Sequence, residues 1–429
     1  MLAADRSQDE PVQGGAPRRG ARQSISGFAS RKADFMKRRT FIALRTRLIT
    51  CLLCAGLLAV GGTLWQTTQA SSTVHQSQGD QSTAPQVHVS GNKLVNARGR
   101  RVVLHGVDRS GGEYSCVRGL GIWDGPMNQS SITAMKRWRI NAVRVPLNEA
   151  CWNGQSYVLR QYRGARYRRA VEAYVRLLNR NGMVAILDLH WTDGAYTGLS
   201  SACSSAEAVC QKPMPDAAQS IPFWTSMARA FKGNNAVIFD LFNEPYPGKA
   251  IGHTGGWRCW LRGGSACTGI SYKVAGMQSL VTAVRSVGAK NLLMLGGLYW
   301  ADDLTRWLEH EPTDPDHNLA ASWHSYSFDD CVTDSCWASQ IAPVIAKIPV
   351  IAGEIGEVNC ADNYIRPLMK WLDALSTSYL AWDWGTDFTC PHAGLITSYT
   401  GTPSGYGAGY RSHLRSLWRR GSRGYKGVN

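Results

Sequence analysis

Residues 237–247, VIFDLFNEPYP, decide the fold. A short run of β-branched and aromatic residues ends abruptly in polar residues and prolines, which is typical of a strand buried in a parallel sheet. Glu244 then lies at the carboxyl end of that strand, the edge at which parallel α/β folds build their sites. Further units of this kind decide between an open sheet and a closed barrel.

Seven other apolar runs follow the same pattern, at residues 102–107, 142–145, 184–189, 292–295, 320–323, 350–352 and 379–381. Amphipathic helices are predicted between them, at 167–180, 223–231, 278–287 and 364–375. Alternating strands and helices over residues 94–410 predict one α/β domain, a (β/α)8 TIM barrel with disulfide-stapled loops. A doubly wound open sheet is the alternative.

The chain before residue 94 divides into three parts. Residues 1–47 are basic and lack an apolar period, so we expect disorder. Within 48–70, the apolar run LITCLLCAGLLAVGGTLW at 48–65 follows a basic flank, the layout of an export signal. Its 18 residues also reach the length of a membrane span, so a cleaved signal peptide and a retained transmembrane anchor both stay open. Residues 71–93 are rich in Ser, Gln and Thr and are predicted to be a linker.

The formal net charge of +16 is concentrated at the two ends of the chain. Before Ser71, eleven Lys and Arg stand against four Asp and Glu (11 − 4 = +7), and six more basic residues lie in the tail at 411–429. A nucleic-acid-binding protein instead gathers basic residues on its folded surface, so this class of partner is not expected. The tail is interpreted as a solvated end, with binding to an anionic envelope polymer as the alternative.

Cysteine usage agrees with export. Two of the 12 cysteines lie in the apolar run, which leaves 12 − 2 = 10 in the body. An even number of cysteines in an exported protein predicts disulfides. We expect three close pairs and two pairs in chain order among the rest: Cys203/Cys210, Cys259/Cys267, Cys331/Cys336, Cys116/Cys151 and Cys360/Cys390. Zinc is the alternative, but the body has no Cys-x-x-Cys pair, so no metal is expected.

Chemically useful side chains end six of the predicted strands. They are Arg144, His190 with Trp191, Asn243 with Glu244, His324 with Tyr326, Glu354, and Trp382. Two carboxylates on the fourth and seventh strands can face each other across the barrel mouth. Hydrolysis of a glycosidic bond with retention needs such a pair and no cofactor. Any one of these residues alone is more often structural, and only the joint set favours an active site.

Each supporting residue has a chemical role in such a site. Asn243 suits a hydrogen bond to the sugar 2-hydroxyl, and Arg144 would keep Glu354 ionised. Tyr326 can orient the nucleophile, while the two histidines can hold carboxylates and sugar hydroxyls. Trp191, Trp300 and Trp382 lie at or just past strand ends and are predicted to offer apolar faces to pyranose rings.

The motifs LHGVDRSG, NAVRVPL, DLHW, DLFNEPY, WHSYSF, VIAGEIG and AWDWG, spread over residues 94–405, resemble glycoside hydrolase family 5, the cellulase-like retaining barrel enzymes. The resemblance implies that Glu244 is the acid/base and Glu354 the nucleophile. It places Arg144, His190, Asn243, His324, Tyr326 and Trp382 in supporting positions. All eight positions carry the expected residue type, so the resemblance implies an active enzyme.

We therefore expect a monomeric, retaining, endo-acting β-glycosidase that hydrolyses a plant-type or microbial β-glycan, with β-1,4-glucan as the first choice. A β-mannanase, an exo-β-glucosidase and a β-1,3-glucanase are the alternatives among enzymes. A non-catalytic carbohydrate-binding barrel is the alternative of another class. The partner is a polysaccharide or oligosaccharide, and the catalytic domain should be extracellular, either secreted or anchored to the cell membrane through residues 48–65.

Overall fold

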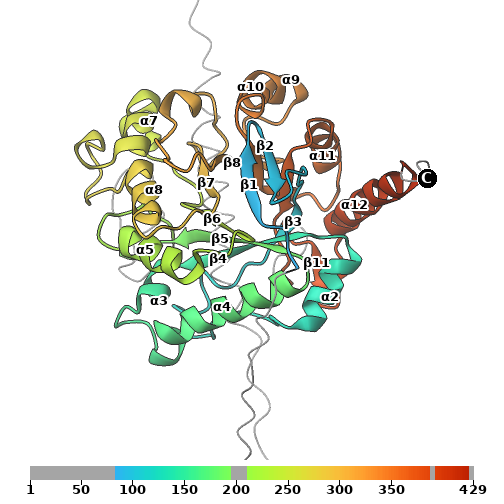
Figure 1. Cartoon of the computed structure of the whole chain (residues 1–429), viewed down its shortest axis with the longest axis horizontal. Helices are drawn as coiled ribbons and strands as arrows, with labels where there is room; N and C mark the ends of the chain where they lie inside the picture. Colours follow the sequence, from blue (N-terminus) through green and yellow to red (C-terminus); the bar gives the residue numbers. More distant parts are fainter. Residues whose placement is uncertain (1–82, 195–209, 387–391, 425–429) are drawn as a thin grey trace, which may run out of the picture. The chain divides into compact units, whose positions relative to one another are not determined.

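Eight parallel strands close into a barrel in this computed structural model, which describes residues 83–194, 210–386 and 392–424 (Figure 1). In order around the ring they are β3 (His105–Asp108), β4 (Ala142–Asn148), β5 (Val184–Trp191), β6 (Val237–Asp240), β7 (Leu293–Gly296), β8 (Leu319–Tyr326), β9 (Val350–Gly356) and β10 (Ser378–Ala381). Pairing of β10 with β3 closes the ring. Each strand overlaps one predicted run, so the predicted (β/α)8 barrel is confirmed.

Helices pack around the strands, and four of them overlap the four predicted segments at 167–180, 223–231, 278–287 and 364–375. The helices are α2 (Gln129–Arg137), α3 (Glu149–Asn153), α4 (Ala165–Arg180), α5 (Ser220–Phe231), α6 (Gly248–Ile251), α7 (His253–Arg262), α8 (Met277–Arg285), α9 (Asp334–Cys336), α10 (Ala342–Ile345), α11 (Ile365–Ala374) and α12 (Gly405–Gly424). In α4, Tyr167, Val171, Tyr174 and Leu178 are buried at spacings of three or four, which turns one stripe of the helix toward the barrel.

The register of the barrel brings site residues to matching heights. Arg144 of β4 pairs with Asp108 of β3, and His324 of β8 pairs with Glu354 of β9. Asp188 of β5 pairs in the same way with Asp240 of β6. Because the strands are parallel, their carboxyl ends point to one side, and polar residues near those ends converge there.

An apolar core fills the other end of the barrel. It contains Leu104, Ala142, Val184, Ile186, Ile238, Leu292, Met294, Ala320, Ile351 and Leu380, together with Val87 and Leu94 from a preceding hairpin. Burial of these side chains supplies the main apolar stabilisation of the ring.

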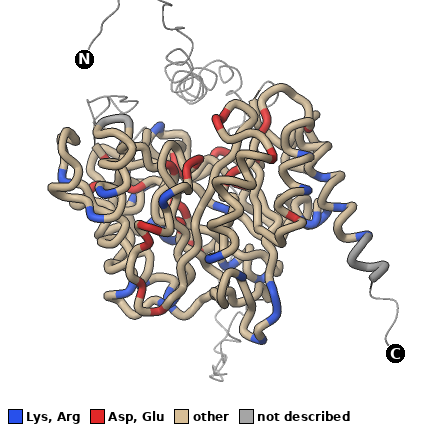
Figure 2. The backbone as a smooth tube through the Cα atoms, turned by 90° about the horizontal axis from the view of Figure 1, so that it is seen from above, with Lys and Arg blue, Asp and Glu red and all other residues tan. Residues whose placement is uncertain are grey.

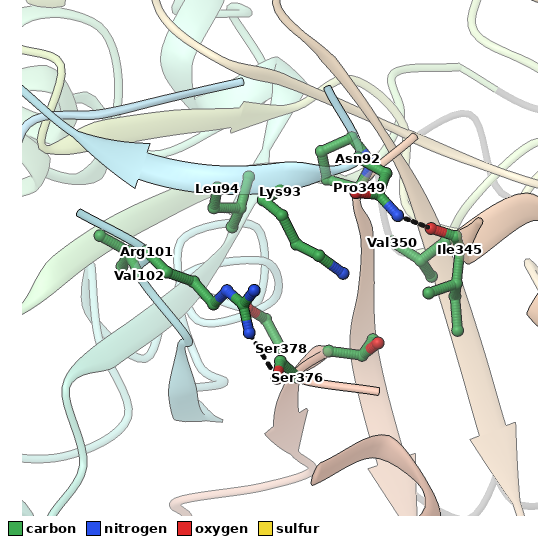
Figure 3. Close-up of a pocket in the computed structure, with 11 residues that line it drawn as sticks. Asn92, Lys93, Leu94, Arg101, Val102, Ile345, Pro349, Val350, Ser376 and Ser378 are labelled. Atoms are coloured by element: carbon green, nitrogen blue, oxygen red, sulfur yellow. Dashed lines mark hydrogen bonds between the residues drawn. The ribbon is translucent and has the colours of Figure 1, made fainter. Parts of the chain in front are cut away.

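That hairpin moves the start of the folded part ahead of the predicted boundary at residue 94. Strand β1 (Val87–Ser90) pairs antiparallel with β2 (Lys93–Asn96), and the N–H of Val87 donates to the carbonyl of Asn235. A small hollow beneath the hairpin is lined by Lys93, Arg101 and Ser376 among others (Figure 3). This strand was not predicted because residues 71–93 are rich in Ser and Gln, and because its apolar residues alternate only over Val87 and Val89.

The predicted tail at 411–429 also differs from the structure, because α12 continues through it to Gly424. Tyr406, Tyr410 and Leu414 are buried, so one face of the helix packs on the barrel. A Cβ at Gly407 would lie 1.8 Å from the carbonyl oxygen of Leu395, so only glycine permits this close approach. Figure 2 shows acidic residues gathered around the middle of the tube, and basic residues mostly on outer segments such as α12.

Three of the predicted disulfides are present: Cys116–Cys151, Cys259–Cys267 and Cys331–Cys336. Cys210 and Cys360 are also disulfide-bonded, while their predicted partners Cys203 and Cys390 lie outside the described residues. The apolar run at 48–65 lies outside them as well. Within residues 83–194, 210–386 and 392–424, no helix is long and apolar enough to cross a membrane.

A polar cluster ties α12 to the barrel. Asp373 of α11 lies 2.7 Å from Nε2 of His413 and accepts a hydrogen bond from the hydroxyl of Tyr379 at 3.1 Å. Nε2 of His105 lies 3.4 Å from the same carboxylate. Burial opposes ionisation of Asp373, but the hydrogen bonds and charges of His105 and His413 outweigh it and lower the pKa of Asp373 to about 2.

We predict that Asp373→Asn destabilises the protein by about 1–3 kcal/mol, because it removes acceptors from buried donors. A carboxylate with a lowered pKa stabilises the fold above its unfolded pKa, and that contribution is lost as the pH falls toward 2. The difference in melting temperature between wild type and variant should therefore be full at pH 6 and shrink toward pH 2. Asp330→Asn, at an exposed position, is the control. A pH-independent difference would contradict the prediction.

Candidate active site

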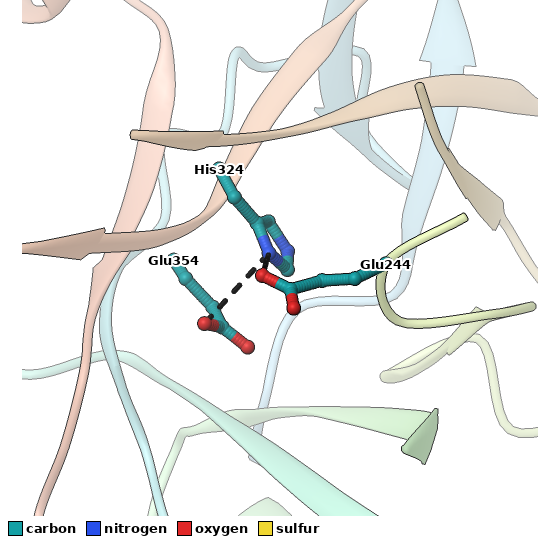
Figure 4. A group of neighbouring side chains, drawn as sticks. All are labelled: Glu244, His324 and Glu354. Atoms are coloured by element: carbon teal, nitrogen blue, oxygen red, sulfur yellow. Dashed lines mark hydrogen bonds and ion pairs between the residues drawn. The ribbon is translucent and has the colours of Figure 1, made fainter. Parts of the chain in front are cut away.

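The two predicted catalytic glutamates meet at the carboxyl end of the barrel, although they lie 354 − 244 = 110 residues apart. Glu244 follows β6, Glu354 belongs to β9, and His324 of β8 stands beside both (Figure 4). Nδ1 of His324 lies 3.1 Å from Oε1 of Glu244 and 3.7 Å from Oε2 of Glu354. One oxygen of each carboxylate lies within 4.8 Å of the other. Both residues are nearly buried, with exposures of 1% for Glu244 and 3% for Glu354.

Arg144 is the cation of this site, and it is completely buried. A guanidinium carries five N–H groups in a planar fork, and here four of them donate hydrogen bonds and one further contact is an ion pair. Nε donates to Asp240 (2.8 Å), Nη1 donates to Asp108 (3.0 Å) and Glu354 (2.8 Å), and Nη2 donates to Asn243 (2.7 Å) and lies 3.1 Å from Asp188. The guanidinium thus connects residues of β3, β4, β5, β6 and β9 or the loops just beyond them.

Three of these acceptors, Asp108, Asp188 and Asp240, are buried carboxyls that sequence reasoning missed as site residues. Each keeps one oxygen without a hydrogen-bond partner among the described residues. Burial raises the pKa of Asp240 to about 8, and it raises the pKa of Asp108 and of Asp188 well above their usual range, in each case against the opposing charge of Arg144. The signal available in the sequence was an aspartic acid inside an apolar strand run, as for Asp188 and Asp240, or directly after one, as for Asp108.

The raised pKa of these three aspartic acids bears on the charge balance around Arg144. Four ionised carboxylates around one guanidinium would leave a large uncompensated negative charge in a buried site. The raised pKa of the three aspartic acids favours their neutral form, and the more they are neutral, the more of the positive charge of Arg144 is left for Glu354. The buried carboxyls therefore act as hydrogen-bonding supports for the guanidinium.

Glu354 is held as an anion by its neighbours. Its Oε1 accepts from Arg144, and its Oε2 accepts from the hydroxyl of Tyr326 at 2.5 Å. Burial alone would raise the pKa of Glu354, but the charges of His324 and Arg144 outweigh it and lower that pKa from its ordinary value of 4.5. The surroundings of Glu354 thus favour its ionised form.

The other predicted binding residues also reach the site. Oδ1 of Asn243 accepts from Arg144, so its amide nitrogen is the atom left for a sugar oxygen. Nδ1 of His190 lies 2.7 Å from Oδ2 of Asp188, which orients the imidazole. Trp382 stacks on the His190 ring, with centroids 5.4 Å apart, and is only 1% exposed. Contrary to the open apolar face predicted for it, Trp382 therefore packs within the wall of the site.

The remaining two predicted tryptophans lie at the end of β5 and after β7, the two strands on either side of β6. Trp191, at 7% exposure, lies against Tyr114, with ring centroids 6.1 Å apart. Trp300 follows β7 and is half-buried. Its ring stacks on that of Tyr246, with centroids 5.3 Å apart, and Tyr246 is close in sequence to Glu244. Trp300 is therefore the more accessible of the predicted aromatic residues.

Trp300 lies in a strained turn. Tyr299, Trp300 and Ala301 have φ values of 51°, 61° and 66°, a left-handed backbone that costs non-glycine residues roughly 1–2 kcal/mol each. The N–H of Trp300 donates to the carbonyl of Pro245, and the carbonyl of Ala301 accepts from the N–H of His324. The turn is thus tied to both sides of the glutamate pair, a pattern that is frequent at functional sites.

Glu244, His324 and Glu354 also have the ligand types and proximity that a divalent cation needs. The two oxygens of Glu354 already accept hydrogen bonds from Arg144 and Tyr326. A cation bound to Glu354 would compete with these bonds and with the charge of the guanidinium. The donor set therefore fits acid–base and nucleophilic roles better than metal ligation.

Comparisons with known proteins agree with the geometry. A family model described as Cellulase (glycosyl hydrolase family 5) matches residues 95–388. Endoglucanase A of Butyrivibrio fibrisolvens is 24% identical over 240 residues, which are 56% of this chain and 45% of that protein, so the chain spans less than half the length of this relative.

Solved structures share the fold. The β-glucanase SdGluc5_26A of Saccharophagus degradans superposes with a TM-score of 0.59 at 20% identity, over 79% of this chain and 95% of that one. A β-mannanase of Thermomonospora fusca superposes with a TM-score of 0.53 at 18% identity, over 76% and 93% of the two chains. Because the family model covers more than half of a chain whose barrel brings these motifs together, the protein belongs to glycosyl hydrolase family 5 and is a retaining glycoside hydrolase.

Proposed function

We propose that this enzyme is an endo-acting β-1,4-glucanase, with Glu244 as acid/base and Glu354 as nucleophile. The observation that carries these roles is the approach of the two carboxylates to within 4.8 Å. Retaining enzymes place their carboxyl groups about 5–5.5 Å apart, whereas inverting enzymes leave about 6.5–9.5 Å for a water molecule. The short separation supports direct attack by one carboxylate on the sugar.

The reaction then has two steps. Glu244 gives its proton to the glycosidic oxygen while Glu354 attacks the anomeric carbon, so the bond to the leaving sugar breaks and a glycosyl ester forms on Glu354. Glu244, now ionised, takes a proton from water, which attacks the same carbon and releases Glu354. Arg144 and Tyr326 support the carboxylate that leaves in the second step.

Neighbouring polar and aromatic residues suit a pyranose substrate. The amide nitrogen of Asn243 is a donor beside the acid/base, as a bond to the sugar 2-hydroxyl requires. His190 is oriented by Asp188, and Trp300 offers a half-buried ring on the side of Glu244. We assign Trp191 and Trp300 to sugar stacking, and Trp382 to support of His190.

The choice of glucan rests on the relatives. One is named as an endoglucanase, and the β-glucanase of Saccharophagus degradans has been solved with cellotetraose. Mannan is the second candidate, because structures of β-mannanases share the fold at comparable TM-scores. The disulfides of the described part support an exported enzyme, with residues 48–65 as the export signal or anchor.

We predict that the purified protein hydrolyses carboxymethylcellulose within a panel that also holds mixed-linkage glucan, mannan, laminarin and xylan. An endo enzyme should lower the viscosity of the polymer well before reducing ends accumulate. Glu244→Gln should lower kcat by at least about 100-fold through loss of general acid catalysis, and Glu354→Gln should reduce activity to background. Glu309→Gln, at an exposed position, is the control. Hydrolysis of mannan alone would select the second candidate, and full activity in either active-site variant would overturn the assignment.

A 2-deoxy-2-fluoro glycoside with a good leaving group should inactivate the enzyme by trapping the covalent intermediate, because the fluorine slows its hydrolysis. Peptide mapping by mass spectrometry should find the sugar on Glu354. Label on another carboxylate would remove Glu354 from the role of nucleophile.

We predict that Tyr326→Phe lowers kcat about 10- to 100-fold, since a hydrogen bond to a charged group is worth roughly 1.5–3 kcal/mol. Loss of the hydroxyl also raises the pKa of Glu354, because hydrogen bonding to the charged form favours ionisation. The nucleophile works ionised, so the acid limb of kcat/KM should lie below the ordinary value of 4.5 in the wild type and move to higher pH in the variant.

The matched control for Tyr326→Phe is Tyr364→Phe. The hydroxyl of Tyr364 pairs with Ser325 instead of a catalytic carboxylate. Its removal should leave the acid limb in place. Coincident acid limbs for wild type and Tyr326→Phe would contradict the role given to the tyrosine.

A further inference from the structure

A short segment at residues 210–213 joins the ends of two neighbouring barrel strands. On the β5 side, the N–H of Thr192 donates to the carbonyl of Cys210 at 3.1 Å, and the N–H of Lys212 donates to Oγ1 of Thr192 at 2.9 Å. On the β6 side, the N–H of Tyr246 donates to the carbonyl of Pro213 at 3.0 Å. The segment is therefore fixed to both strand ends.

Gln211, within this segment, holds the main chain of Glu244. Its Nε2 donates to the carbonyl of Glu244 at 2.6 Å, and its Oε1 accepts from the N–H of Glu244 at 3.1 Å. The hydroxyl of Tyr246 donates to the carbonyl of Gln211 at 2.9 Å, which holds the glutamine in place. One side-chain amide thus satisfies both main-chain polar groups of the proposed acid/base.

Glu244 needs such a support because it lies beyond the regular part of its strand. β6 ends at Asp240, and the main-chain hydrogen bonds of this segment to neighbouring strands end with those from Leu241 to Met294 and from Asn243 to Leu189. The side-chain amide of Gln211 takes the place of a neighbouring strand for the next residue. A backbone held by two hydrogen bonds limits where its carboxyl group can move.

We propose that Gln211 is a positioning residue for the proton transfers of Glu244. This inference rests on the proposed function, in which Glu244 protonates the leaving oxygen and later deprotonates water. Proton transfer requires hydrogen-bond reach of about 2.6–3.2 Å. A displacement of about 1 Å can cost about 100-fold in rate. Loss of the amide should therefore impair the steps that use Glu244 and spare the attack by Glu354.

Leaving groups of different basicity separate these steps. Phenolate leaves poorly and needs the proton of Glu244, whereas 2,4-dinitrophenolate leaves without one. For Gln211→Ala we expect kcat/KM on phenyl β-cellobioside to fall about 10- to 100-fold, within the range of general acid catalysis. On 2,4-dinitrophenyl β-cellobioside, kcat/KM should be unchanged. There kcat and KM should fall together, because hydrolysis of the covalent intermediate needs Glu244 as base. If the enzyme hydrolyses mannan instead of glucan, the phenyl and 2,4-dinitrophenyl β-mannobiosides replace the cellobiosides in this test.

Two further glutamine variants sharpen the test. Gln211→Glu keeps an acceptor for the N–H of Glu244 but loses the donor to its carbonyl when ionised, so its loss should resemble that of Gln211→Ala. Gln219→Ala is the control, since Gln219 is also half-buried and accepts from Asn153 without contacting Glu244. It should leave the rates on both substrates unchanged. Melting temperatures of all variants exclude loss of the fold as the cause.

The outcomes distinguish this inference from the proposed function. An equal loss of kcat/KM on both substrates, or no loss on either, in folded Gln211→Ala would overturn the positioning role. Glu244→Gln must itself show the leaving-group dependence. If Glu244→Gln loses activity equally on both substrates, the acid/base assignment fails, and with it the proposed function.

Discussion

The active site depends on one buried cation. Arg144 has no exposed surface, and its guanidinium makes four hydrogen bonds and an ion pair with Asp188 near the carboxyl ends of the strands. A buried guanidinium is costly unless it is fully hydrogen-bonded, and a single missing acceptor would leave an unsatisfied charge. The strands that supply these acceptors are therefore held in one relative arrangement, and that arrangement places Glu354 next to the arginine.

The surrounding aspartic acids explain how one arginine can serve so many partners. Burial outweighs the charge of Arg144 and raises the pKa of Asp108, Asp188 and Asp240, which favours the neutral form of these three acceptors. Among these four carboxyls, Glu354 is the one that also has an ion pair with His324 and a hydrogen bond from the hydroxyl of Tyr326. The same buried environment thus raises the pKa of three carboxyls while the pKa of Glu354 is lowered, and the difference comes from their immediate neighbours.

Loops beyond the strand ends also hold the backbone of the active site. Glu244 lies past the end of β6, where the turn at residues 299–301 and the segment at 210–213 approach it from two sides. Both contacts are made through main-chain groups, by Pro245 to Trp300 and by Glu244 to Gln211. A strained turn and a side-chain amide together hold a residue that the barrel ladder does not reach. The disulfide Cys116–Cys151 joins the loop after β3 to α3, which follows β4 at the same end of the barrel.

The sequence by itself determined the barrel, because each buried strand is a short local run whose polar end marks the site. The order of those ends was enough to predict Glu244, Glu354, Arg144 and the histidines at one site, and short spacing identified two of the disulfide loops. Two elements were not predicted because their local patterns are weak. The hairpin from Val87 lies in Ser- and Gln-rich sequence, and α12 begins with alternating glycines.

Only the tertiary structure decided the protonation of Asp240, the burial of Trp382 and the contact of Gln211 with a residue 244 − 211 = 33 positions away. Each depends on contacts between residues that are far apart in the chain, and local periodicity does not predict such contacts.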